Sequence, residues 1–153
     1  MAFRFRLEKV LAVRRREEEE AERRHAEARR ERDRAREEVE RQRAALLRAN
    51  EALDALKRKG EMSADDLFLH ASHVAGVRRR LREAEAGLAA AEDRVRREHE
   101  ALLQAHQARE ALEKLREREE ARWKEAERRR ETQILDEVAL TRRPLGEEEP
   151  HGP

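Results

Sequence analysis

Cysteine is absent from this sequence of 153 residues, and so is tyrosine. Without cysteine the chain can form no disulfide, no cysteine-based metal site and no thiol nucleophile. No apolar run approaches the ~18 residues that a membrane-spanning helix needs, and the start of the chain lacks the apolar core and small-residue cleavage site of a secretory signal. We therefore expect a cytoplasmic protein, with any membrane association peripheral and made through partners.

Aromatic residues are scarce as well, at 3% of the chain, whereas charged residues make up 48%. A compact globular domain carries about 25% charged residues. The 37 basic and 36 acidic residues are interleaved and leave a net charge of only +1. A nucleic-acid groove needs a basic stripe, so we expect no nucleic-acid partner.

Catalytic and metal-binding patterns are also missing from the sequence. His70 with His73, and His99 with His106, are spaced as pairs, but neither pair has an acidic or cysteine set that completes a metal site. No glycine-rich phosphate loop is present. The many carboxylates are explained by charged helix faces. We expect no enzymatic activity, no metal and no cofactor.

Apolar residues recur at two positions of a seven-residue repeat in two long stretches. In the first stretch the repeats run from Leu7 to Leu56 and from Leu11 to Leu53; in the second they run from Val74 to Trp123 and from Val77 to Ala126. Repeats of this kind, with Arg and Glu between them, are typical of coiled-coil helices.

The stretch "LKRKGEMSADDLFLH" separates the two repeats. Gly60 suits the end of a helix, and Ser63 with Asp66 suits the start of the next one. A connection this short makes neighbouring helices antiparallel. We predict an all-α fold, a long two-helix antiparallel coiled-coil hairpin over residues 1–143 with its turn near 60–63. Residues 144–153, rich in Pro, Gly and Glu, are predicted to be a disordered tail.

A turn centred at 61–62 also predicts the register, because it places His25 opposite Glu98. A shift of one heptad is the alternative, which pairs Arg32 with Glu98 and Leu7 with Trp123 but needs a longer loop. In the favoured register the second arm is longer than the first, so a C-terminal helix projects at the base of the hairpin. Polar seam residues gather toward this base, which should therefore fray before the tip.

Two apolar clusters have two possible interpretations each. At the tip, Met62 and Leu67 to Leu69 either plug the end of the hairpin or contact a partner. At the start, Phe3 and Phe5 either stabilise a fraying helix end or present an apolar face to a partner. The residues alone leave both questions open.

The two ends of the base carry the most specific pattern. "FRFRLEKVLAVRRREEE" at the start and "LDEVALTRR" near the end resemble the terminal signatures of the flagellar export protein family FliJ. The length near 150, the charged helical hairpin and the Gly/Ser turn near residue 60 extend this resemblance over almost the whole chain.

The resemblance implies a function that periodicity does not. FliJ proteins are non-enzymatic cytoplasmic components of the flagellar type III export apparatus, and they resemble the stalk subunit of rotary ATPases. The implied partners are the hexameric export ATPase, the export gate membrane protein and export chaperones. The alternatives are a generic coiled-coil scaffold or spacer without an ATPase partner, and a nucleic-acid-associated hairpin.

Stalks of this kind insert the end with both termini into their ring, which implies an ATPase contact at the base. The residues expected there are Phe3, Phe5, Leu7, Ile134, Leu135, Asp136, Glu137 and Val138. Alternatively, Leu135 and Val138 fold back on the start of the first arm. The residues expected to contact the export gate, at the tip, are Leu67, Phe68, His73 and Val74.

Overall fold

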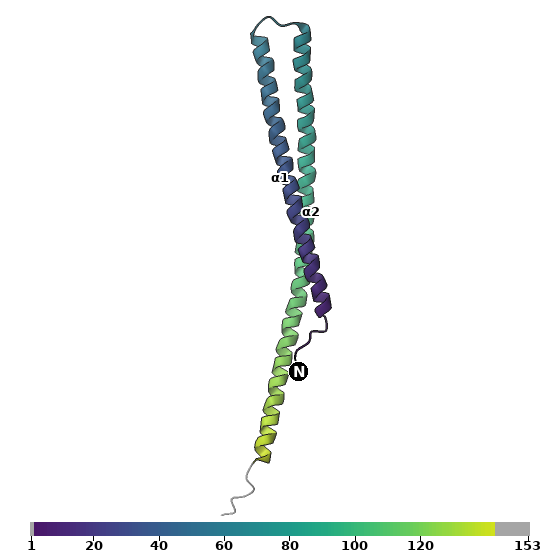
Figure 1. The fold of residues 1–153 in the computed structure, drawn as a ribbon, viewed down its shortest axis with the longest axis vertical. Helices are drawn as coiled ribbons and strands as arrows, with labels where there is room; N and C mark the ends of the chain where they lie inside the picture. The colour runs from purple at the N-terminus through teal and green to yellow at the C-terminus, as the bar shows by residue number, and fades with distance from the viewer. Residues whose placement is uncertain (1, 143–153) are drawn as a thin grey trace, which may run out of the picture.

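The computed structural model describes residues 2–142, which form two long α-helices and no strand. α1 comprises Glu8–Arg58 and α2 comprises Ala64–Thr141. The two helices run antiparallel and pack against each other along the length of α1 (Figure 1). At 1.5 Å per residue they are about 75 Å and about 115 Å long. The predicted all-α class with two long helices is confirmed.

Residues 59–63 connect the helices through local signals that the sequence contains. The backbone N–H of Lys59 donates a hydrogen bond to the carbonyl oxygen of Leu56 at 3.3 Å, and Gly60 follows in the left-handed region with φ of 71°. Glycine adopts this conformation without the steric cost that a side chain brings. Ser63 then accepts a hydrogen bond on its Oγ from the N–H of Asp66 at 3.1 Å, which caps the start of α2.

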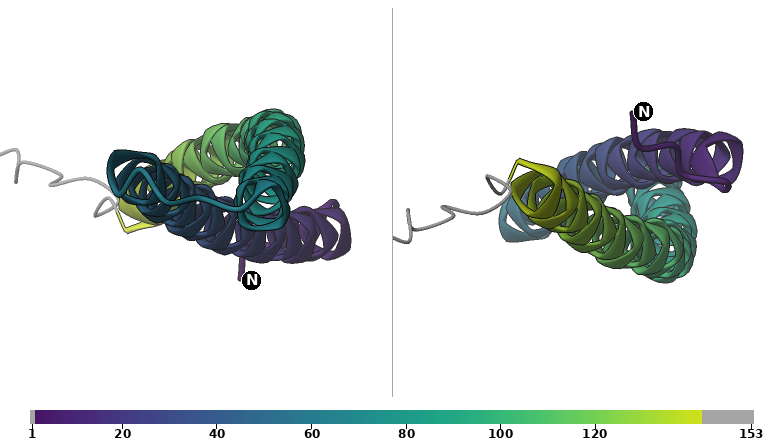
Figure 2. Two further views of the ribbon diagram at one scale, coloured as in Figure 1. Left: turned by 90° about the horizontal axis from the view of Figure 1, so that it is seen from above. Right: turned by 90° about the horizontal axis from the view of Figure 1, so that it is seen from below.

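The seam between the helices is narrow because much of it is alanine. The helices wind around each other, as the two end-on views in Figure 2 show. The side chains with at most 5% exposure all come from the predicted seven-residue repeats; in α1 and α2 they are Leu11, Ala21, Ala28, Val39, Ala49, Val74 and Val77.

The register of the two arms follows the turn centred at 61–62. Arg24 pairs with Glu98 at 3.4 Å, and the ring of His25 lies 5.4 Å from that of His99. The alternative shift would have paired Arg32 with Glu98, but Arg32 binds Asp33 of its own helix at 3.1 Å. The two contacts across the arms lie closer to the favoured register than to the shift of one heptad.

Residues 2–7 are not helical and form an N-terminal strap beside α2. Phe3 lies against Trp123 with ring centroids 6.1 Å apart, and Phe5 is only 6% exposed. Phenylalanine alternates with arginine here, so an extended backbone directs both rings to one side. Arg6, on the other side of the alternation, reaches Glu119 at 3.9 Å.

Beyond the strap, α2 continues without a break to Thr141 (Figure 1). Residues 128–142 are all exposed, and we call them the overhang. The C-terminal helix predicted from the sequence is the last part of this one long helix and not a separate element. The predicted tail, 144–153, and the domain boundary at 143 lie outside the described residues.

Candidate partner-binding surfaces

An apolar surface is exposed at the tip, where α2 begins. Leu67, Phe68 and Leu69 are 38%, 72% and 65% exposed. Consecutive helical residues point about 100° apart, so three in a row cannot all face a single neighbouring helix. Phe68 therefore does not plug the end of the hairpin, which is one of the two interpretations of the tip cluster. Its side chain is available to a partner.

The other two tip candidates differ from each other in exposure. His73 is exposed beside the tip surface, whereas Val74 is 5% exposed and packs in the seam with Val77. The spacing of three between these valines is that of seam residues in a coiled coil. Val74 therefore stabilises the hairpin and offers no surface to a partner in this structure.

The overhang carries the second apolar surface. Ile134, Leu135 and Val138 are 59%, 67% and 38% exposed, and Asp136 and Glu137 beside them are exposed too. The alternative in which Leu135 and Val138 fold back on the first arm is not observed. Leu140 is a further exposed leucine, at 67%, that was not among the residues expected here, although the apolar pattern of "ILDEVAL" includes it.

The three strap residues expected at the ATPase contact are all at least partly covered. Phe5 is buried, Phe3 is half-buried against Trp123, and Leu7 is half-buried where α1 begins. Each aromatic side chain that is buried contributes a large apolar area. This arrangement supports the interpretation that Phe3 and Phe5 stabilise the end of the hairpin, and Phe5 has almost no surface left for a partner.

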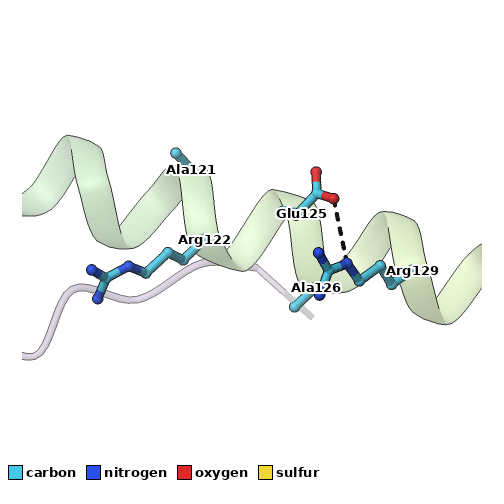
Figure 3. A pocket seen from close by; sticks show the side chains of 5 residues that line it. All are labelled: Ala121, Arg122, Glu125, Ala126 and Arg129. Atoms are coloured by element: carbon cyan, nitrogen blue, oxygen red, sulfur yellow. Dashed lines mark ion pairs between the residues drawn. The ribbon is translucent and has the colours of Figure 1, made fainter.

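A shallow hollow on α2 lies where the strap passes, as Figure 3 shows. Two alanines leave space between longer polar side chains, and Glu125 pairs with Arg129 at 3.4 Å across it. A hydrogen bond from Arg128 holds the pKa of the Glu125 carboxyl below its usual range. The hollow is lined by Ala121, Arg122, Glu125, Ala126 and Arg129. No sequence motif marks it.

Polar residues that interrupt the seam near the base bind one another across the arms. The Arg109 Nε donates to Glu18 Oε2 at 2.6 Å, and its Nη1 donates to Glu113 Oε2 at 2.6 Å. Arg15 of α1 also donates to Glu113, at 3.3 Å. The hydrogen bonds that Arg109 makes to Glu18 and Glu113 raise the pKa of Arg109. The hydrogen bond from Arg109 to Glu113 also lowers the pKa of Glu113. We call Arg15, Glu18, Arg109 and Glu113 the base network.

The histidines do not form a metal centre within residues 2–142. There, no group of three or more histidine or acidic side chains is placed to hold an ion. His25 and His99 instead face each other across the seam. Burial lowers the pKa of His25, and the positive potential of His99, Arg29 and Arg32 adds to this effect.

Comparison with known families identifies the chain. The family described as Flagellar FliJ protein matches residues 3–143, which is nearly the whole sequence. The chain belongs to the FliJ family. It is therefore a component of flagellar type III export, as the terminal signatures indicated. Across residues 2–142 of this family member, neither helix has a stretch apolar enough to cross a membrane.

A solved structure has the same fold as this FliJ family member. It is described as that of a YscO homolog from Chlamydia trachomatis, with a TM-score of 0.50 and 19% sequence identity. The similarity covers 92% of this chain and 99% of the other. At this identity the likeness supports the long helical hairpin and nothing finer. Among curated proteins no match was found.

Proposed function

We propose that this chain is a non-enzymatic, cytoplasmic stalk that links the hexameric export ATPase to the membrane export gate and also interacts with export chaperones. The observation that carries the proposal is that exposed apolar surface lies at both ends of a charged section of the hairpin. We call this section, between the tip surface and the overhang, the shaft. The tip surface and the overhang lie at opposite ends of α2, about 100 Å apart along a helix that rises 1.5 Å per residue.

The shaft between these surfaces is suited to a spacer. Its exposed large apolar residues are few: Leu47 and Leu103 stand alone, and Val10 and Val13 form one pair at spacing i, i+3 near the start of α1. Scattered apolar residues of this kind are normal on protein surfaces and do not mark binding sites. Two packed helices also keep the ends at a fixed separation, which a flexible linker would not do.

At the base, the overhang would dock with the export ATPase. Ile134, Leu135 and Val138 would supply apolar burial, and Asp136 and Glu137 would pair with basic groups of the ring. A lone helix gains stability when its apolar face enters a groove. Phe3 and Leu7, half-buried in the strap nearby, would complete the contact from the other terminus, whereas the buried Phe5 would act only by holding the strap.

At the tip, Leu67 and Phe68 would contact the export gate, and the exposed His73 would border that contact. Leu69, which is 65% exposed, belongs to the same surface. Val74 is not part of this proposal because its side chain is buried in the seam.

Truncation after Glu131 tests the ATPase contact. The removed residues include the apolar part of the overhang, all of it exposed, so the remaining hairpin should stay helical and keep its melting temperature. Binding to the purified ATPase and stimulation of its ATP hydrolysis should both be lost. Unchanged binding by the truncated chain would contradict the assignment of the base.

Phe68→Ala is the matched variant at the other end. Because Phe68 is 72% exposed, its removal should leave the melting temperature and ATPase binding unchanged. Binding to the cytoplasmic part of the export gate should fall about tenfold, as expected when an exposed aromatic anchor is lost from an interface. If gate binding persists in Phe68→Ala but is lost on truncation, the two ends have been assigned the wrong way round.

A further inference from the structure

One face of the overhang has an acidic residue at one end, a basic residue at the other and apolar residues between them. Glu131, Ile134, Leu135, Val138 and Arg142 follow the spacing i, i+3, i+4, i+7 and i+11. Residues with this spacing lie on one side of an α-helix. All five are exposed, and we call them the overhang stripe.

The overhang stripe is not a continuation of the seam. Counting by sevens from the repeat positions Trp123 and Ala126 leads to four exposed residues, of which Leu140 alone is apolar; they are Arg130, Gln133, Glu137 and Leu140. The apolar residues of the stripe therefore lie on a different side of α2 from the one that the first arm covers. A partner on this face approaches without displacing α1 or the strap.

The charged side chains at the two ends of the stripe make no ion pair within residues 2–142. The neighbouring arginines are already paired, since Arg128 and Arg129 bind Glu125 and Arg130 binds Glu127. Glu131 and Arg142 make no such pair in the described part of the chain. Each can therefore bind an opposite charge on another molecule without breaking an ion pair of residues 2–142.

We infer that the occupant of the overhang stripe is the same stripe of a second copy, packed antiparallel. With the two-fold axis between residues 136 and 137, Glu131 of each copy faces Arg142 of the other, and Leu135 faces Val138. Such a contact is self-complementary, as a two-fold interface requires. A parallel pair would instead set Glu131 against Glu131 and Arg142 against Arg142.

The acidic residues closest to the axis do not oppose this pairing. Asp136 and Glu137 are absent from the i, i+3, i+4, i+7 set, so they point away from the contact. The contact is short, so the dimer should be weak and in rapid exchange. It uses the surface proposed for the ATPase, so self-association and ATPase binding should exclude each other, but the self-association itself does not depend on that proposal.

Charge reversal tests the inference with the full-length chain alone. Sedimentation equilibrium from about 10 to about 500 µM should show the mass rising from 18.1 kDa toward twice that value. Glu131→Lys and Arg142→Glu should each weaken association about fivefold, because each removes both of the two symmetric ion pairs. The double variant should restore association, since the pairs re-form with the charges exchanged.

Two further variants provide the controls. Glu137→Lys changes the charge by the same amount on another face and should leave association unchanged. Leu135→Asp should abolish it while the helical signal stays constant, because Leu135 is 67% exposed in the single chain. The inference is overturned if the wild-type chain stays at 18.1 kDa throughout, if Leu135→Asp still associates, or if the double charge reversal fails to restore association. ATPase binding by the double charge-reversal variant is measured as well. If this variant regains self-association but not ATPase binding, the two properties are separate, and this inference stands independently of the proposed function.

Discussion

Apolar burial joins the arms at both ends of the shaft, but within residues 2–142 only the part toward the base adds ion pairs between them. Near the tip, residues 44–58 and 64–80 meet through apolar side chains, with Val77 at 2% exposure, and no ion pair joins the arms in this part of the described chain. The cross-arm ion pair nearest the tip is Arg43 with Glu85, at 4.0 Å. Toward the base, charged pairs join the arms at successive layers down to Glu8 with Arg116, at 3.1 Å.

The difference shows how a coiled coil with nearly half of its residues charged can still pair its helices. Where the seven-residue repeat loses its apolar residues, the arms present opposite charges to each other, as Glu18 and Arg109 do. Apolar burial depends little on ionic strength, whereas partly exposed ion pairs are screened by salt. The two sections should therefore respond differently to mutation, salt and pH.

The largest effect is expected for Val77→Ala in the tip section. Val77 is 2% exposed, so removing two methyl groups should lower the free energy of unfolding by about 2 kcal/mol. Thermal melting followed by circular dichroism measures this loss, which should be the same at low and at high salt. Val13→Ala is the control, because Val13 is 49% exposed and its truncation should cost less than about 0.5 kcal/mol. A strongly salt-dependent loss in Val77→Ala would erase the distinction between the sections.

A smaller effect is expected for Glu18→Ala in the base network. Losing the 2.6 Å hydrogen bond from Arg109 should lower the free energy of unfolding by about 1 kcal/mol at low salt. At about 1 M salt the loss should fall to less than half of that value, since screening already weakens the pair. Glu22→Ala is the matched control, because Glu22 is exposed and makes no ion pair within residues 2–142.

Amide exchange on the wild-type chain locates the effect of salt along the hairpin. The predicted fraying of the base before the tip is retained, but the base network makes it dependent on salt. Exchange near Glu18 should accelerate at high salt more than exchange near Val77. Uniform protection along both arms at every salt concentration would count against this prediction.

The smallest effect is expected from the histidine pair midway between the sections. His25 faces His99 and Glu98 from α2, with Arg29 and Arg32 on its own helix, and Arg24 pairs with Glu98. The pKa of His25 in the folded chain lies below its ordinary value of 6.5. The unfolded chain therefore takes up more protons in the window below 6.5, and stability is lost as the pH falls through it.

Between pH 7.5 and pH 5.5 the melting temperature should therefore drop by about 2 °C in the wild-type chain. His25→Gln should reduce this drop, whereas His73→Gln, at an exposed position, should leave it in place. At lower pH a separate loss should follow, because the lowered pKa of Glu113 makes protonation of that carboxylate destabilising. An identical pH dependence in wild type and His25→Gln would show that the pair is neutral toward stability.

Much of the fold could be predicted because its signals are local or periodic. The repeats place Leu11, Ala21 and Val39 in the seam, and Gly60 and Ser63 mark the turn. The register follows from these two facts, since a five-residue connection leaves little freedom for one helix to slide along the other. The candidate binding residues were harder to predict, because apolar character alone does not distinguish a seam residue such as Val74 from an exposed one such as Phe68.

The sequence by itself determined the two helices, their antiparallel pairing and the charged shaft, because a seven-residue period and a short capped turn permit few other arrangements. Only the tertiary structure decided which apolar residues are covered. The strap buries Phe5 because residues 2–7 leave the helical path and lie on α2, and Val74 is buried because the arms meet there. The overhang stays uncovered because α1 begins at Glu8, so no first-arm residue extends far enough to reach Leu135. Burial depends on where one helix ends relative to the other, and that is a property of the pair rather than of either repeat.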